Sequence, residues 1–475
     1  MYRKSVFLGL CALMLASTVM LASTTGPSSS HANYIDGSIP GVDFVAILTA
    51  GDSVKKRGTA SDSYRMVGIP DGLGAFDNLD GTITVLMNHE LTANAGVVRR
   101  HGGAGAFVSR WQIRKSDLKV LNGIDQIERV MMWDASAQAY ALSTSTAFSR
   151  FCSADLPSAT AFFNSATGKG LPGDTLLYLN GEEDAAATAG RAMAHVVTGK
   201  ETGTSYEIFK LGRHSWENVL ANPYSQDTTL VAATEDGGLN KVFFYVGQKQ
   251  ETGNPVEMAG LTNGTAYELS ISGYTNDDPV AGFKKGNFSL VASGGTSLAR
   301  PEDGAWDPTN PSRFYFVTTA SITGNSRLWK MTFSDITKPT LGGSIEVVVD
   351  GGTDIKMMDN ITIDDSGRVY MQEDVGNDSR LGRIWSYGPE GVRQLATHSP
   401  YFFGSVSLLT GTTFETQDEE ASGIIDVTRF FTGEPGFDTT TYRYMLLDSQ
   451  VHASLGGEIV ERGQLLMMRV PRTLP

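Results

Sequence analysis

Cysteine is almost absent from this chain. Cys11 and Cys152 are the only two among 475 residues. Cys11 lies in an apolar N-terminal stretch that we expect to be removed, so the mature chain would keep one thiol and could not form an internal disulfide. Basic residues are also few, since 38 Lys and Arg face 52 Asp and Glu. The net charge of −14 argues against nucleic-acid binding and suits a protein that gathers cations.

Long apolar runs are missing after the N-terminus, so we expect no membrane anchor. At the N-terminus, Arg3 and Lys4 precede an apolar stretch over residues 6–21, and small and polar residues continue to Ala32. This arrangement is typical of a secretory signal. We therefore predict a signal peptide over residues 1–32 and a mature protein over residues 33–475 that is periplasmic or secreted.

Helical periodicity is scarce as well, and residues 186–195 are the main helical candidate. No Pro- or Ser-rich linker and no charge block divides the chain, whereas 53 glycines are spread over its whole length. We therefore expect one large domain rather than several small ones.

A repeated unit is the most informative feature of the sequence. A turn rich in Asp, Asn or Gly leads to a short apolar strand and then to polar or acidic residues, as in residues 80–90. Further copies occupy residues 173–184, 226–236, 310–319, 365–374 and 442–450. Continuous apolar strands are typical of sheets that are buried on both faces. The pattern predicts an all-β fold, a β-propeller of six blades with loop insertions, with a β-sandwich or a two-domain β protein as the alternative.

The propeller prediction has a consequence for the acidic residues at the strand ends. Equivalent strands line one central channel, so residues far apart in sequence can meet there. The acidic candidates are Glu90, Glu183, Glu235 and Glu373. Converging carboxylates repel one another unless cations or protons intervene, and carboxylates are ligands for calcium and other hard ions.

A family resemblance rests on a series of short motifs. They are Val67–Gly74 leading to Asn88-His89-Glu90, Phe151-Cys152, Gly181–Glu183, Gly212–Glu217, Thr234–Asp236, Arg300–Asp303, Asp359-Asn360, Glu420–Gly423 and Gln450–His452. In this order they resemble the PhoX-type alkaline phosphatases over residues 65 to 455.

The resemblance implies a six-bladed propeller that holds iron and calcium and hydrolyses phosphate monoesters. It also implies that Glu90, Cys152, Glu235 and Glu302 lie at or near the metals and that Arg300 faces the substrate phosphate. We predict Arg300 and Glu302 as catalytic, and the metal ligands as Glu90, Cys152, Glu183, Glu217, Glu235 and Glu302. A thiolate binds iron well, and a planar guanidinium can hold two phosphate oxygens.

Each of these residues has a plainer interpretation. A single cysteine is often a small buried hydrophobe, and His89 can be a core histidine. Two other functions also fit the same scaffold. One is a calcium-dependent hydrolase of another ester class, lactonase or phytase-like, and the other is a calcium-stabilised binding propeller without catalysis. We expect a phosphatase that acts on small organic phosphate esters.

Overall fold

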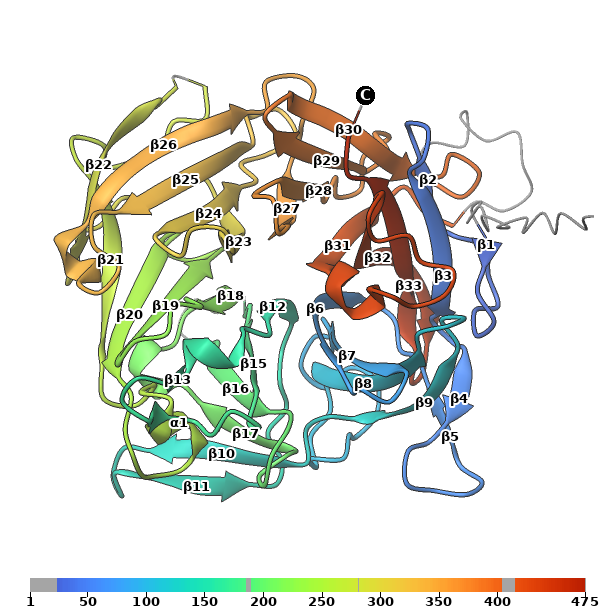
Figure 1. Cartoon of the computed structure of the whole chain (residues 1–475), viewed down its shortest axis with the longest axis horizontal. Helices are drawn as coiled ribbons and strands as arrows, with labels where there is room; N and C mark the ends of the chain where they lie inside the picture. Colours follow the sequence, from blue (N-terminus) through green and yellow to red (C-terminus); the bar gives the residue numbers. More distant parts are fainter. Residues whose placement is uncertain (1–23, 185–188, 281, 404–414, 475) are drawn as a thin grey trace, which may run out of the picture.

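The computed structural model describes residues 24–184, 189–280, 282–403 and 415–474. The predicted signal segment therefore falls largely outside the described residues. Within them the chain is almost entirely β-structure, arranged as a β-propeller around a central channel (Figure 1). The all-β propeller prediction is confirmed. No helix in the described part of the chain is long and apolar enough to cross a membrane.

Six units of four antiparallel strands follow one another around the channel in the described residues. The inner strands are β6 (Pro70–Asp77), β12 (Phe151–Asp155), β18 (Trp216–Ala221), β23 (Pro301–Trp306), β27 (Met358–Ile363) and β31 (Glu419–Asp426). The second strands are β7 (Thr82–His89), β15 (Leu177–Glu182), β19 (Thr228–Glu235), β24 (Arg313–Thr318), β28 (Val369–Glu373) and β32 (Tyr442–Gly456). The third strands are β8 (Phe107–Arg114), β16 (Ala192–Val196), β20 (Val242–Gln248), β25 (Arg327–Phe333), β29 (Arg383–Gly388) and β33 (Val460–Pro471). The fourth strands are β9 (Val120–Asp125), β17 (Thr204–Glu207), β21 (Thr265–Ile271), β26 (Gly343–Asp350), β30 (Gly391–His398) and β3 (Asp43–Thr49).

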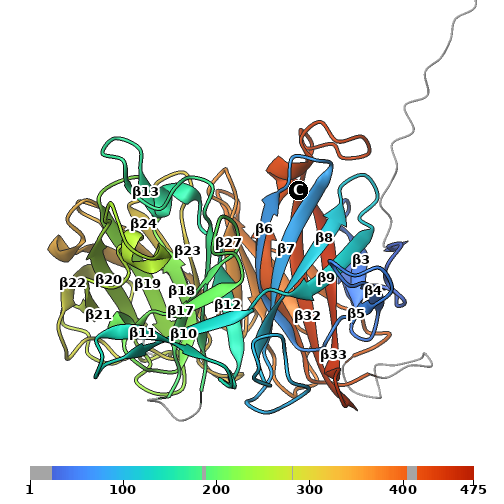
Figure 2. The ribbon, with the colours of Figure 1, turned by 90° about the horizontal axis from the view of Figure 1, so that it is seen from below.

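The two ends of the chain close the ring. Strand β3, near the N-terminus, pairs with β33, near the C-terminus, so the last unit contains both ends of the described chain. Each inner strand packs against the next, and β31 packs against β6 to complete the circle. Short extra strands extend the rim, as β2 (Ile35–Gly37) does on β30 and β22 (Lys285–Val291) does between β21 and β26. The edge-on view in Figure 2 shows the units as upright sheets around the channel.

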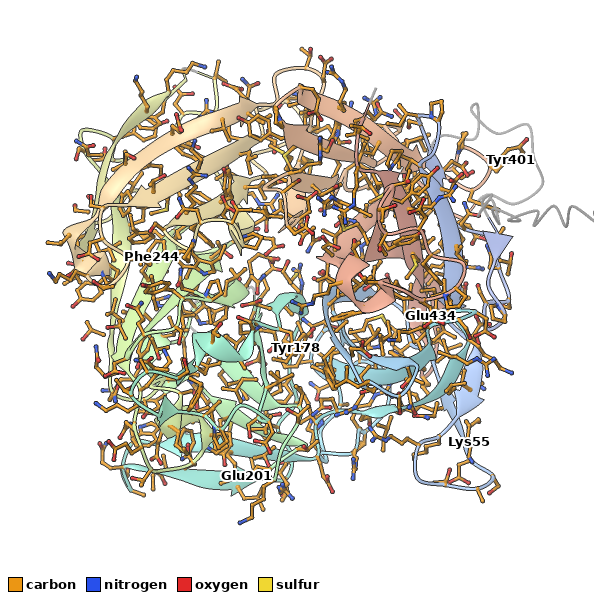
Figure 3. The ribbon with its side chains drawn as sticks, in the orientation of Figure 1. Lys55, Tyr178, Glu201, Phe244, Tyr401 and Glu434 are labelled. Atoms are coloured by element: carbon orange, nitrogen blue, oxygen red, sulfur yellow. The ribbon has the colours of Figure 1, made fainter. Side chains whose placement is uncertain are left out.

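The apolar core is divided into layers between neighbouring units. In β24, Phe314 and Phe316 face the third unit while Tyr315 and Val317 face the fifth. Successive side chains of a strand point to opposite faces, so a strand between two packed sheets must be apolar throughout. Phe244 of β20, labelled in Figure 3, packs between the third and fourth units against the rings of Trp306, Phe314 and Phe333.

One sequence prediction differs from the structure in the type of element. The helix expected over residues 186–195 is not formed in the described residues of that range, because Ala192–Val196 is the buried strand β16 between β15 and β17. Residues 185–188 lie outside the described residues. Residues 24–32, placed in the signal peptide, contact the folded body, since β1 (Thr24–Thr25) pairs with β3.

Candidate metal centre

One acidic or thiol side chain lies at the same place in every inner strand. It is the second residue of the strand, and the six residues are Asp71, Cys152, Glu217, Glu302, Asp359 and Glu420. We call this set the inner ring. In five of the six units the pairing register shifts at this residue. Such a bulge bends the strand and re-aims a side chain, which here brings the groups of different units together.

A second set of residues follows the last paired residue of each second strand. They are Glu90, Glu183, Asp236, Thr319, Asp374 and His452, which we call the outer ring. Each donates its backbone N–H, over 2.8–3.1 Å, to the carbonyl of the residue that precedes the inner strand of its unit. Those acceptors are Ile69, Arg150, Ser215, Arg300, Met357 and Asp418. The same hydrogen bond in all six units shows that the positions are structurally equivalent.

Three groups within these rings have the geometry of metal sites. They are Asp71, Glu90 and Cys152; Cys152, Glu183 and Glu217; and Glu217, Glu302 and Asp359. In each group the potential ligand atoms lie within 4.8 Å of one another. Consecutive groups share Cys152 and Glu217, so the three form one continuous row. Most of these side chains are buried, and buried charges must be paired or must bind metal.

The electrostatics also favour cations. Burial, together with the neighbouring carboxylates, raises the pKa of Asp71, Glu302 and Asp359 well above the ordinary values. Burial raises the pKa of the Cys152 thiol too, with Glu217 as the next cause. Oε1 of Glu302 has no hydrogen-bond partner among the described residues, although Arg300 Nη2 lies 3.1 Å away. A bound cation would satisfy such groups, since carboxylates are ligands for hard cations and a thiolate is a ligand for transition metals.

Arg150 neutralises one side of the row. Its guanidinium contacts Glu90 Oε1 at 2.6 Å and Glu183 Oε2 at 2.5 Å. Burial alone would raise the pKa of Glu90, but Arg150 and Gln450 outweigh it, so that pKa is lowered. The Gln450 side-chain amide donates to Glu90 at 2.9 Å and to Asp71 at 3.2 Å. These two side chains hold the first group of carboxylates in place.

Arg300 lies at the other end of the row. Its Nε and Nη2 donate to Asp236, with Nη2–Oδ2 at 2.7 Å, and Nη2 also pairs with Glu302 at 3.1 Å. The Arg300 side chain is 42% exposed, whereas that of Glu302 is only 3% exposed. An oriented and accessible guanidinium beside candidate metal ligands can bind an anion.

The floor of the centre is a layer of polar side chains. Ser153 donates from Oγ to Glu217 at 2.5 Å, and Asn360 donates to Asp71 and to Ser153. Tyr178, near the middle of the ring in Figure 3, donates to the Gly72 carbonyl at 2.6 Å and ties the first two units together. Beyond this layer a cavity of about 470 Å³ opens at the opposite end of the channel.

Five of the six predicted ligands meet in this centre. Glu90, Cys152, Glu183, Glu217 and Glu302 all belong to the three groups, and Arg300 contacts Glu302. Glu235 does not join them, because its carboxylate accepts the backbone N–H groups of Leu239 at 2.9 Å and Asn240 at 2.5 Å. Side chains alternate along a strand, so the next residue, Asp236, takes the position facing the channel. Glu373 is likewise directed to Arg380 and Trp385, while Asp374 takes the outer-ring position.

Several site residues were not predicted from the sequence. They are Asp71, Arg150, Asp236, Asp359, Asp374, Glu420 and Gln450. Asp71, Asp359 and Glu420 lie in motifs that carried the family resemblance, and aligning the six units on their inner strands would have indicated them. His89, by contrast, is a core histidine whose ring bonds to Ser109 Oγ and the Gly68 carbonyl.

Comparisons with known proteins agree with this architecture. No protein-family model and no curated protein matches the sequence. Among solved structures, Pseudomonas fluorescens PhoX in complex with vanadate, a transition-state analogue, superposes with a TM-score of 0.58 at 11% identity, over 94% of this chain and 98% of that chain. The chain has the PhoX fold. The predicted resemblance to PhoX is thus confirmed at the level of the fold.

Two further solved structures match this chain less well. A Dyadobacter fermentans protein of unknown function matches with a TM-score of 0.41 at 8% identity, over 90% of this chain and 99% of that one. Trypanosoma rangeli sialidase in complex with sialic acid matches with a TM-score of 0.40 at 9% identity, over 91% of this chain and 59% of that one.

Proposed function

We propose that this chain is an exported, metal-dependent phosphatase that hydrolyses phosphate monoesters in the centre formed by the two rings. The observation that carries the proposal is the row of three ligand groups that ends beside the accessible guanidinium of Arg300. A phosphate monoester presents anionic oxygens that both cations and Arg300 can bind. The PhoX-like fold supports the same function.

The donor sets favour different metals along the row. The groups that contain Cys152 combine a soft sulfur with carboxylates, which suits iron. The group of Glu217, Glu302 and Asp359 offers oxygen atoms only, which suits calcium. We therefore propose that Glu90, Cys152, Glu183, Glu217 and Glu302 are metal ligands, with Asp71 and Asp359 added to the set.

The side chains of this protein divide the work. Bound cations would neutralise the carboxylates, polarise the phosphoryl group and lower the pKa of water. Arg300 would donate to the phosphate oxygens, and Asp236 would keep its guanidinium pointed at them. As charge develops in the transition state, the guanidinium is already in place to stabilise it. Glu302 would hold metal next to the phosphate that Arg300 binds.

Hydrolysis of an aryl phosphate by the purified protein tests the proposal. We expect activity that disappears on calcium chelation and returns with calcium. Arg300→Met and Glu302→Gln should each reduce kcat/KM by about a hundredfold or more, the loss reported for a single transition-state contact. Full activity in both variants would contradict the site assignment. Turnover of lactones but not of phosphates would indicate another ester class, and calcium-dependent stability without turnover would indicate a binding protein.

A further inference from the structure

The outer ring has one position without a titratable side chain. Five of its six members are Glu90, Glu183, Asp236, Asp374 and His452, and the sixth is Thr319 in the fourth unit. Thr319 is 1% exposed, and its Oγ1 has no hydrogen-bond partner among the described residues. A buried hydroxyl without a partner is costly to keep and calls for an explanation.

Thr319 lies directly across from Arg300. Pro301 pairs with Thr318, and one step outward the Thr319 N–H donates to the Arg300 carbonyl at 2.9 Å. Opposed residues of an antiparallel pair have their side chains on the same face, with Cβ atoms roughly 5 Å apart. The second unit demonstrates the contact, because Arg150 and Glu183 occupy the same two positions and pair at 2.5 Å.

The difference between these two units concerns the charge beside the arginine. In the second unit Glu183 is the opposed residue, so Arg150 is held between it and Glu90. In the fourth unit a neutral hydroxyl replaces that carboxylate. Asp236 takes Nε and Nη2 of Arg300, and Nη1 has no partner among the described residues. Thr319 Oγ1 and Arg300 Nη1 are therefore two polar groups without a hydrogen-bond partner among the described residues, on opposed residues of the fourth unit.

We propose that Thr319 Oγ1 donates a hydrogen bond to a phosphate oxygen of the substrate and, with Arg300, forms the anion-binding recess of the site. This proposal rests on the proposed phosphatase function and names the residue that makes one side of the ring accept an anion. A carboxylate in this position would repel the phosphate and pair with Arg300, as Glu183 pairs with Arg150. The neutral residue is therefore required where the phosphate binds.

The test compares three variants in the calcium-loaded protein, with aryl phosphate hydrolysis and calorimetric binding of orthophosphate as separate readouts. Thr319→Val keeps the shape and removes the hydroxyl, so KM and the orthophosphate Kd should rise about tenfold, the usual effect of losing one hydrogen bond to a charged group. Thr319→Ser should keep wild-type values. Thr319→Asp should abolish orthophosphate binding while calcium binding remains.

The control is Thr318→Val. Thr318 precedes Thr319, but its Oγ1 accepts from Trp329 Nε1 at 3.1 Å, so only stability should change. If wild-type protein hydrolyses aryl phosphate and Thr319→Val binds orthophosphate equally well, the Thr319 proposal is overturned and the phosphatase proposal stands. If wild-type protein neither hydrolyses the ester nor binds orthophosphate, the proposed function fails and the recess fails with it.

Discussion

Arg150 and Arg300 occupy the same backbone position in two units of the propeller. Each precedes the inner strand of its unit, each has a positive φ, of 43° and 59°, and each contacts an outer-ring carboxylate of the preceding unit. An L-residue adopts this region only when the surrounding structure compensates for the strain. The bends direct both guanidinium groups to the channel. Their surroundings differ, so we propose that Arg150 neutralises the centre and that Arg300 binds the substrate.

The neutralising role of Arg150 can be measured as stability. In Arg150→Met two buried carboxylates, Glu90 and Glu183, lose their counter-charge. Breaking a buried ion pair costs about 3 kcal/mol, and because Arg150 is 39% exposed we expect about 2 kcal/mol in metal-free protein. Reloading the protein with iron and calcium should recover most of this loss in denaturant unfolding, because Glu90 and Glu183 both belong to the ligand groups that contain Cys152.

The control is Arg114→Met, which removes an exposed pair with Asp117. That variant should change stability by less than about 0.5 kcal/mol. An equal loss for Arg150→Met in metal-loaded and metal-free protein would show that Arg150 acts by packing rather than by charge.

Two neighbouring acidic residues of the third unit, Glu235 and Asp236, should have different effects when each is replaced. Asp236→Asn weakens the hydrogen bonds that orient Arg300, so kcat/KM for an aryl phosphate should fall about tenfold, the effect of a loosened contact to a charged group. Glu235→Gln weakens the acceptor for two backbone N–H groups, so it should lower stability by about 1 kcal/mol and leave kinetics unchanged. The reverse result would place Glu235, and not Asp236, in the site.

This pair of residues illustrates what the sequence can and cannot predict. The repeated turn, apolar strand and acidic end sufficed for the propeller, because strands between packed sheets must be apolar on both faces. The sequence did not show which of two consecutive residues at the end of a strand faces the channel. Thr234–Asp236 ends in two acidic residues, and only the last paired position determines which carboxylate faces the channel.

The inner ring was harder to predict for another reason. Asp71 and Asp359 stand at the start of their strands and reach the channel through a bulge, which no hydrophobic period indicates. The helix expected near Ala192 failed because neighbouring strands bury that segment, and such packing overrides local helix propensity. Cys152 was predicted through the family resemblance, because a single cysteine by itself indicates no more than a small buried side chain.

Cys152 provides a test of the metal identity. Its thiol belongs to two of the three ligand groups and lies 3.1 Å from Glu183. Cys152→Ser replaces a soft donor by a hard one, so elemental analysis should find iron lost and calcium retained. Glu302→Gln is the matched variant and should reduce calcium first. Iron retained at the wild-type ratio in Cys152→Ser would rule out the thiol as an iron ligand.

A buried histidine away from the centre should set part of the acid sensitivity. His195 bonds to Ser205 and Asn180, and burial lowers its pKa to about 3. The unfolded chain binds this proton near pH 6.5 and the folded one does not, so stability is lost as the pH falls below 6.5. His195→Gln should remove up to about 3 kcal/mol of the loss between pH 6.5 and pH 4, at about 1.4 kcal/mol per pH unit.

Denaturant unfolding at both pH values measures the effect. If His195→Gln loses as much stability between pH 6.5 and pH 4 as the wild-type protein does, the His195 ring accepts its proton without unfolding.

The start of the mature chain is the last prediction. Thr24 and Thr25 pair with Val45 and Ala46 of β3, and Ser29 Oγ lies 2.8 Å from Thr49 Oγ1. Cleavage after residue 32 would remove these contacts from the unit that closes the ring. We therefore expect the exported protein to begin near Thr24, which the intact mass of secreted material would show. Recombinant chains that start at Thr24 and at Asn33 should differ in stability by about 3 kcal/mol or more, since at least five hydrogen bonds between residues 24–32 and the rest of the chain are lost, at roughly 0.5–1 kcal/mol each. A secreted protein that begins at Asn33 and is as stable as the longer chain would contradict this.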